Sequence, residues 1–273
     1  MRLVLVGGGS FIARHMFRAA QKAGLDAVPL PHDADLASAL KSSDVVVNFA
    51  LDPAYFSGPY SEETDCDLRA ARQAKNAGAR ITMLSTRRVY TAATRWGARE
   101  TEAAVGDETF YGRNKARSEA SILDLFEGRV AIFRLSNVFG FEHEPGRSRR
   151  TFFAQMLRSL KTENVIRFDM HPDTRRDFVP VEVCVNAILQ RAADGTEDVL
   201  NLGCGFPVRC GDLAQWVLEG YGQGELIVDP PVVKDEFFLN MDQWRLRFPG
   251  TIDPDGLRDY CQEIGRRLQL TRS

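Results

Sequence analysis

The sequence has no long hydrophobic run, and it carries almost no net charge. No apolar stretch approaches the roughly 20 residues that a membrane-spanning helix needs, so no membrane partner is expected. The 273 residues have a net charge of −2, and the isoelectric point is about 6.1. This balance gives no indication of a nucleic-acid-binding surface.

Cysteine and histidine are few and scattered. The five cysteines form no Cys-x-x-Cys pair and leave an odd one over, which indicates reduced thiols in a cytoplasmic protein. The four histidines lack metal-ligand spacing, so no metal site is expected. The chain passes from Met1 directly into a predicted strand, without the pattern of a secretion signal.

Strand-like and helix-like segments alternate through the first half of the chain. Because the strands are nearly continuous apolar runs, the alternation predicts an α/β fold, a doubly wound parallel sheet with helices on both faces. The regularity fades after Gly140, so we expect a sheet domain over 1–140, to which 176–205 returns, and a smaller α/β lobe over 141–273. The predicted strands are 2–6, 26–30, 44–50, 80–85 and 129–135, and the predicted helices are 11–23, 36–41, 62–77, 111–127 and 151–160.

A glycine-rich turn, VGGGSFIARHMF, follows the first predicted strand and opens a helix. Glycines here let the backbone approach a pyrophosphate, and the free N–H groups of the helix N-terminus favour an anion. The position of the turn, directly between strand and helix, raises the specificity of an otherwise weak signal.

This turn resembles the G-x-x-G-x-x-G loop of the extended short-chain dehydrogenase/reductases, the NAD-dependent epimerase/dehydratase family that modifies nucleotide sugars. The family glycines align with Gly7, Ser10 and Ala13, so two of the three are replaced by small residues. The resemblance implies a Rossmann-type fold that binds NAD or NADP. The residues implied to bind this cofactor are Gly7, Ser10, Phe11 and Ile12 in the loop, the pair Asp35-Leu36 at the adenine, Asn48 and Ala50 after the third strand, and Lys115.

Two later motifs extend the resemblance into the second half. FRLSNVFG is similar to the family motif Arg-Pro-x-Asn-Val-Tyr-Gly, and RRDFVPVEV is similar to a motif of the substrate lobe. The implied substrate is a nucleotide sugar contacted by Asn137, Arg176 and, more weakly, Lys234. The family also implies a homodimer through the helices 62–77 and 111–127.

The end of the second predicted strand bears on the choice between NAD and NADP. An acidic residue there binds the ribose 2′-hydroxyl and selects NAD, whereas a basic one accepts a 2′-phosphate. Pro31 and His32 occupy this position, although Asp33 follows and an exposed, uninvolved His32 is the alternative interpretation. The lack of an acid at the expected place favours NADP.

The segment YGRNK places Tyr111 and Lys115 one helical turn apart on the same face. A carbonyl reduced by hydride needs a proton donor at its oxygen, and a nearby ammonium favours the ionised form of a phenol. Thr86, at the end of the strand 80–85, supplies a hydroxyl that can orient the substrate oxygen. By the resemblance, Thr86, Tyr111 and Lys115 form the catalytic set; the alternative for Lys115 is a solvated helix lysine.

Arg87 and Arg88 follow Thr86 directly. In sugar-nucleotide 4,6-dehydratases these positions hold an Asp-Glu pair, and an arginine cannot act as that acid or base. A 3,5-epimerase-reductase would need a cysteine near 88 and a histidine closer to Gly140 than His143, so both reactions are disfavoured. Arg88 can instead bind an anionic part of the substrate, or both arginines can pair with surface acids such as Glu100 or Glu102.

Three functions remain open. The sequence favours reduction of an NDP-keto-sugar, because the short segment after the second strand resembles that of 4-keto-6-deoxysugar reductases. The second possibility is a 4-epimerase that retains NAD. The third is a non-catalytic dinucleotide sensor, which the retention of both Tyr111 and Lys115 disfavours.

Overall fold

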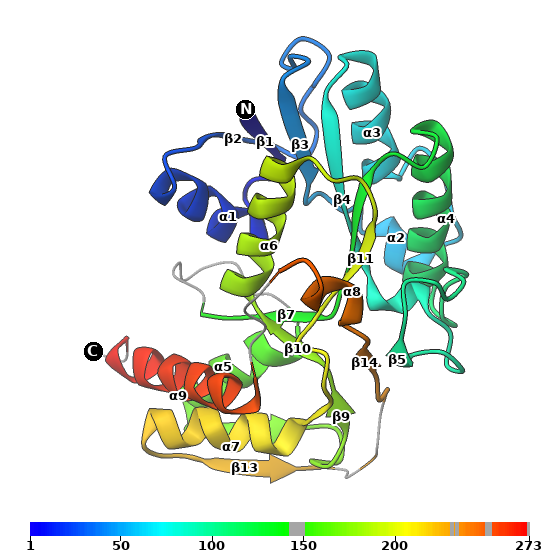
Figure 1. The fold of residues 1–273 in the computed structure, drawn as a ribbon. Coiled ribbons are helices and arrows are strands. Elements are labelled where there is room, and N and C mark those ends of the chain that lie inside the picture. Colours follow the sequence, from blue (N-terminus) through cyan, green and yellow to red (C-terminus); the bar gives the residue numbers. More distant parts are fainter. Residues whose placement is uncertain (142–150, 230–231, 233–234, 249–252, 272–273) are drawn as a thin grey trace.

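The computed structural model describes residues 1–141, 151–229, 232, 235–248 and 253–271. Its centre is a six-stranded parallel sheet with the order β11-β6-β4-β3-β1-β2 (Figure 1). The strands are β1 (Arg2–Val6), β2 (Asp26–Leu30), β3 (Asp44–Asn48), β4 (Arg80–Thr86), β6 (Ala131–Leu135) and β11 (Val199–Leu202). The predicted α/β class and the doubly wound parallel sheet are confirmed.

Both faces of the inner strands are buried, whereas the edge strand β2 is exposed to intermediate in burial, and alternate residues of each strand face opposite sides. Leu3 and Leu5 of β1 belong to one hydrophobic cluster with α1 (Phe11–Lys22) and α6 (Val181–Asp194). Val4 and Val6 belong to another, with α3 (Cys66–Asn76) and α4 (Phe110–Leu125). Burial on both faces is the reason that these strands are continuous apolar runs.

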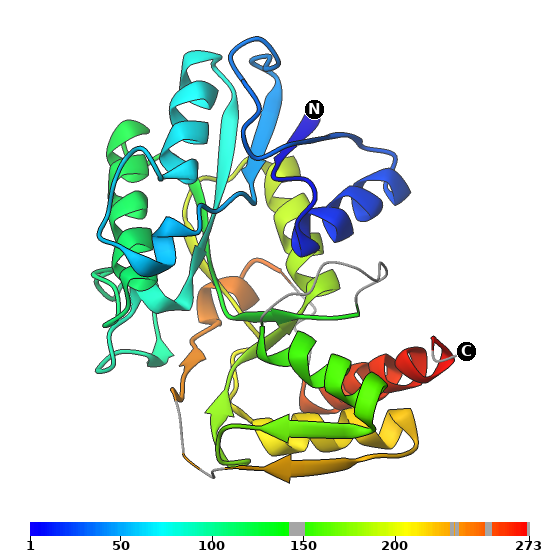
Figure 2. The same ribbon diagram turned by 180° about the vertical axis from the view of Figure 1, so that it is seen from behind.

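A second lobe lies below the sheet in both ribbon views (Figures 1 and 2). It has a separate hydrophobic cluster, built from α5 (Phe152–Glu163), α7 (Cys210–Tyr221), α9 (Pro254–Leu270) and the parallel pair β8 (Val165–Phe168) and β13 (Glu225–Val228). The short elements are η1 (Arg87–Val89), β7 (Asn137–Phe139), β9 (Arg175–Arg176), β10 (Phe178–Pro180), β12 (Val208–Arg209), β14 (Phe238–Leu239) and α8 (Asp242–Arg245). The remaining elements are α2 (Ala54–Ser57) and β5 (Trp96–Ala98).

The helix predicted over 36–41 is wrong. This region forms only one turn, in which the N–H groups of Ala39 and Leu40 both donate to the Leu36 carbonyl. Leu36 is buried, and an Asp35 carboxylate oxygen accepts from the Ala37 N–H. The link runs from β2 to β3, which lie on either side of β1, and its one buried anchor, Leu36, does not provide the apolar face that a longer amphipathic helix needs.

The helix predicted over 62–77 begins later, at Cys66, because the Asp65 side chain caps it by accepting from the Leu68 N–H. All five cysteines are buried and free of disulfides, as expected. None of the described helices combines the length and apolarity needed to cross a bilayer.

Candidate functional site

The glycine-rich loop forms one wall of a groove of about 490 Å³ at the carboxyl ends of β1, β2 and β3. Gly7 has φ of +73°, and a Cβ atom there would lie 2.8 Å from the Ala50 backbone nitrogen, so only glycine fits. Of the predicted cofactor residues, Gly7, Ser10, His32 and Ala50 line this groove. Among the described residues that line it, none is acidic.

Ser10 has a structural task in this loop. Its hydroxyl oxygen accepts a hydrogen bond from the Ala13 N–H at 3.3 Å and caps α1. The O–H hydrogen remains available as a donor. The serine that stands in place of a family glycine therefore stabilises the start of α1.

The other predicted cofactor residues lie outside this groove lining. The side chains of Phe11 and Leu36 are buried in hydrophobic clusters, Ile12 packs against one of them, and Asp35 is exposed. Asn48 is buried, and its amide nitrogen donates to the Ala50 carbonyl at 3.1 Å and to Asp67 at 2.8 Å. Asn48 thus braces the end of β3 from inside the protein.

Tyr111 and Lys115 lie on the first two turns of α4, which packs directly on η1. At Gly112 a Cβ atom would lie 2.5 Å from the Arg88 carbonyl oxygen, so glycine permits this close approach. The ring of Tyr111 stacks on Phe56 with a centroid distance of 4.9 Å and an interplanar angle of 17°. The close packing brings the turn that carries Tyr111 beside the strand end that carries Thr86.

Lys115 is not a solvated helix lysine, since it is only 4% exposed. Its ammonium donates to an Asp67 carboxylate oxygen and, at 3.0 Å, to the Leu84 carbonyl of β4. Burial lowers the pKa of Lys115, but the nearby charge of Asp67 and the phenol of Tyr111 raise it, and the result lies above its ordinary value. Lys115 is therefore a fixed positive charge within electrostatic reach of Tyr111.

Thr86 ends β4 and is 8% exposed. Its hydroxyl oxygen accepts from the Arg88 N–H at 3.3 Å, which leaves the O–H free to donate. Ser85, the residue before Thr86, donates a hydrogen bond to Glu119, which lies one turn beyond Lys115 on α4. Glu119 also pairs with Arg134 of β6 at 2.8 Å. These buried contacts hold the end of β4 in place under Thr86.

The arginines after Thr86 do not pair with Glu100 or Glu102 as suggested. Both contact Asp235, which lies just before β14: Arg87 binds its two carboxylate oxygens, and Arg88 binds one of them at 3.2 Å. Arg88 also pairs with Asp107 at 2.6 Å. Burial raises the pKa of Asp235, but Arg87 and its cationic neighbours lower it to about 2.

The predicted substrate residues Asn137 and Arg176 lie on paired elements between the two lobes. Asn137 begins β7, which pairs with β10, and Arg176 on β9 donates from Nε to the Asp235 carbonyl at 3.3 Å. Lys234 and His143 fall outside the described residues. Arg88 and Arg176 thus meet at one residue, Asp235, while no described contact links Asn137 to them.

Sequence reasoning missed several residues that build the site. Asp67 and Glu119 are buried acids on helices, and Arg95 pairs with Asp235, the same carboxylate that Arg87 and Arg88 contact. Only Glu119 carried a signal, since it follows Lys115 by four residues on the same helix face. In the part of the chain that the structure describes, no group of three or more histidine, cysteine or acidic side chains is arranged to hold a metal.

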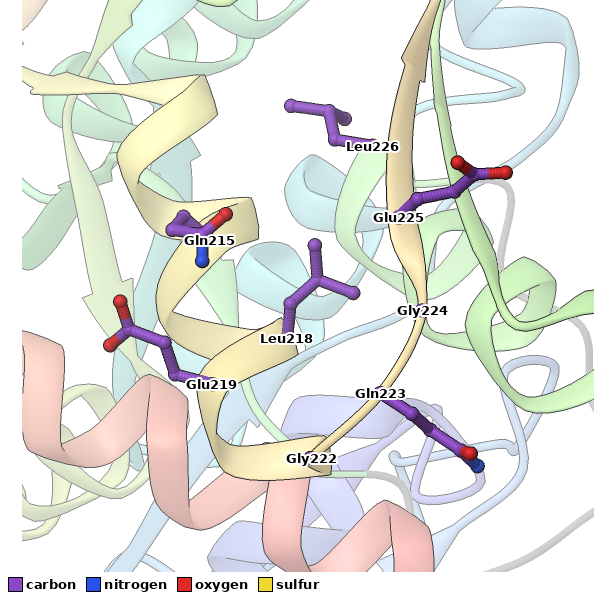
Figure 3. A pocket seen from close by; sticks show the side chains of 8 residues that line it. All are labelled: Gln215, Leu218, Glu219, Gly222, Gln223, Gly224, Glu225 and Leu226. Carbon is purple, nitrogen blue, oxygen red and sulfur yellow. The ribbon is translucent and has the colours of Figure 1, made fainter.

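A separate hollow lies in the second lobe, between the end of α7 and the start of β13 (Figure 3). Its polar side chains include Glu219, whose carboxylate accepts from Gln262 and Arg258 of α9. It contains none of the predicted site residues. This hollow is therefore distinct from the candidate site at the carboxyl edge of the large sheet.

Solved structures with this fold are numerous. A UDP-N-acetylglucosamine 4-epimerase from Bacillus cereus superposes with a TM-score of 0.82 at 14% identity, covering 98% of this chain and 99% of that one. An NAD-dependent NDP-hexosamine 5,6-dehydratase involved in tunicamycin biosynthesis gives 0.78 at 18%, covering 100% and 98%. A UDP-glucuronic acid 4-epimerase from Bacillus cereus, solved with NAD and a fluorinated UDP-glucuronic acid, gives 0.78 at 15%, covering 99% and 100%. At these identities the likeness establishes the fold.

No curated protein matches the sequence. A family model does, over residues 3–203, which include the glycine loop, Thr86, Tyr111 and Lys115. This match spans most of the chain and agrees with the motifs and with the geometry of the sheet edge. The protein belongs to the NAD dependent epimerase/dehydratase family.

Proposed function

We propose that the protein is an NAD(P)-dependent oxidoreductase that reduces the keto group of a nucleotide-activated sugar. The proposal is supported by the position of Thr86 at the carboxyl end of β4, with Tyr111 and Lys115 on α4, on the same edge of the sheet as the glycine-loop groove at the ends of β1, β2 and β3. The groove fits a dinucleotide, because its wall at Gly7 has no side chain and α1 begins against it. A nicotinamide bound there supplies the hydride.

The side chains have separate tasks in this reaction. Thr86 donates a hydrogen bond to the substrate oxygen and orients it, and Tyr111 delivers the proton as the carbonyl becomes a hydroxyl. Lys115 keeps its charge through Asp67 and stabilises negative charge at the phenol. The contacts of Asp67 and Leu84 fix the ammonium in one position, so this electrostatic support needs no rearrangement.

The choice of NADP is a further part of the proposal. The lack of an acid among the described groove residues removes the usual partner of a ribose 2′-hydroxyl. Arg69 on α3 donates to the His32 carbonyl at 3.2 Å and brings a positive charge to this end of the groove. NAD is the alternative, since the family is NAD dependent and the similar UDP-glucuronic acid 4-epimerase was solved with NAD.

Epimerisation at C4 with retained NAD is the second candidate function. The observation in its favour is that similar folds include 4-epimerases of UDP-sugars. The same Tyr111 and Thr86 chemistry serves both reactions. An epimerase purifies with bound dinucleotide and turns over without added cofactor, whereas a reductase consumes added NADPH or NADH.

The family resemblance also supports a homodimer formed through α3 and α4. Light scattering of the purified protein measures its molar mass and so tests the dimer.

The test replaces Tyr111 by Phe and follows turnover of keto-sugar nucleotides with added NADPH or NADH. We expect turnover to fall by about 10²-fold or more, because the proton donor is lost, while dinucleotide binding measured by calorimetry is retained. Tyr260→Phe, on α9, is the matched control, since that hydroxyl donates to Glu182 instead. Unchanged turnover in Tyr111→Phe, with normal binding, would refute the assignment.

A further inference from the structure

Three guanidinium groups converge on the single carboxylate of Asp235. We name Arg87, Arg88 and Arg95 the arginine cradle. One carboxylate oxygen accepts from Arg87 at 3.0 Å and from Arg95 at 3.2 Å, and the other accepts from Arg87 and, at 3.2 Å, from Arg88. Both oxygens are therefore gripped from two sides, which is the geometry that arginine forks offer to a carboxylate.

The cradle and its occupant come from different parts of the chain. The arginines belong to η1 and to the loop before β5, whereas Asp235 precedes β14 and is 148 residues from Arg87. The guanidinium of Arg87 also lies 3.8 Å from the ring centroid of Phe237, so its position is fixed from a second side. The sheet domain thus supplies the three cations, and a segment far away in the sequence supplies the carboxylate.

The charges of this group do not balance. Among the described residues, the cradle's three cations pair with two carboxylates, those of Asp235 and Asp107. Asp235 also has φ of +46°, in the left-handed region that favours glycine and that aspartate adopts more readily than most other residues. The excess of positive charge attracts a further anion of the same chemistry as the Asp235 carboxylate.

The position of the cradle indicates which part of a ligand it meets. Arg87 and Arg88 follow Thr86 by one and two residues, so their Cα atoms lie within roughly 7.6 Å of the Thr86 Cα. A carboxylate at C6 of a hexose is only two carbon–carbon bonds from C4, where the reacting oxygen would lie. The diphosphate of the nucleotide is farther from the reacting carbon, and Arg176 is its candidate partner.

We propose that the arginine cradle binds a carboxylate carried on the sugar of the nucleotide-sugar substrate, and that Asp235 occupies the cradle until this carboxylate displaces it. This inference rests on the proposed function and narrows it to nucleotide-activated uronic acids. Asp235 is then an internal competitor, and its removal strengthens binding of carboxylate-bearing ligands alone.

Isothermal titration calorimetry with UDP-glucuronic acid and UDP-glucose tests this proposal, because the two ligands differ only at C6. Titrations use the full-length protein saturated with NADP or NAD. We expect Asp235→Asn to bind UDP-glucuronic acid about tenfold more tightly than the unmodified protein does, while its affinity for UDP-glucose changes less than about threefold. An equal change for both ligands, or no change for either, overturns the proposal.

A second variant makes the test independent of the folding of Asp235→Asn. Arg88 and Arg95 are about one-third exposed, so Arg88→Gln/Arg95→Gln should fold, and we expect it to lose about tenfold in affinity for UDP-glucuronic acid alone. Arg99→Gln is the control, since Arg99 is exposed and pairs with Asp242 at 3.6 Å. Retained preference in the double variant overturns the proposal. If neither UDP-sugar binds any form of the protein, this proposal is overturned, whereas the proposed function is decided separately by turnover of keto-sugar nucleotides in Tyr111→Phe. Equal binding of both UDP-sugars overturns the proposal and leaves that function standing.

Discussion

The ion pair of Lys115 with Asp67 and the arginine cradle around Asp235 both lie at the carboxyl end of β4, but they differ in burial and in charge balance. The side chains of Lys115 and Asp67 are 6% and 3% exposed, and one cation meets one anion. The cradle is partly open, since Arg95 is 31% and Asp235 24% exposed, although Arg87 is only 8% exposed. Its three cations pair with two carboxylates, Asp235, which all three share, and Asp107.

This difference separates two uses of charge in one site. A balanced, buried pair acts on the groups beside it, here Tyr111, but attracts anions from solvent only weakly, and removing one partner leaves an uncompensated charge in the interior. An unbalanced, partly exposed group of charges still attracts anions. When one of its ion pairs is lost, the remaining pairs and water compensate for part of the lost interaction. We therefore interpret the Asp67–Lys115 pair as fixed support for Tyr111 and the cradle as an exchangeable binding site.

The largest effect is expected for Asp67→Ala. This change leaves the buried ammonium of Lys115 without its carboxylate, so the free energy of unfolding should fall by about 3–5 kcal/mol in urea titrations. The double variant Asp67→Ala/Lys115→Met removes both charges, and we expect it to regain much of that stability without regaining turnover. A decrease of less than about 1 kcal/mol in the free energy of unfolding would contradict the role of the Asp67–Lys115 pair as the fixed support of Tyr111.

An intermediate effect is expected for Arg87→Met. Met keeps much of the buried apolar contact and removes the bidentate bond, but Asp235 retains Arg88 and Arg95. We expect the free energy of unfolding to fall by about 1–2 kcal/mol, measured in the same urea titrations. Introducing Asp235→Asn into this variant should cost little more. A loss as large as that of Asp67→Ala would show that the cradle is structural in the same sense as the buried pair.

The smallest effect is expected for Arg95→Gln. Its one contact with Asp235, at 3.2 Å, is partly exposed and is shared with Arg87. The free energy of unfolding should change by less than about 1 kcal/mol, and the change should shrink further at high salt. A larger, salt-independent loss would contradict the exchangeable character that we assign to the cradle.

The fold and part of the site followed from local patterns. Apolar strands buried on both faces predicted the sheet, and the spacing of Tyr111 and Lys115 placed both on one face of α4, where the structure has them. The glycine loop predicted the groove wall at Gly7. The prediction of a helix over 36–41 was wrong, because a short periodic stretch does not show how many of its apolar residues are buried. Here Leu36 alone is buried.

The partners of the charged residues could not be predicted. Asp67 stands in a polar stretch of helix that is typical of a solvated surface, and only the packing of α3 against α4 and β3 buries it beside Lys115 and Asn48. Arg87 and Arg88 had nearby acids in the sequence, Glu100 and Glu102. The chain path brought them Asp235 instead.

The sequence by itself determined the parallel sheet, the glycine loop and the residue types Thr86, Tyr111 and Lys115, because hydrophobic period and helical spacing act over a few neighbouring residues. Only the tertiary structure decided which charges are neutralised and which remain available. That outcome depends on burial and on contacts between segments far apart in the chain, and neither leaves a local pattern.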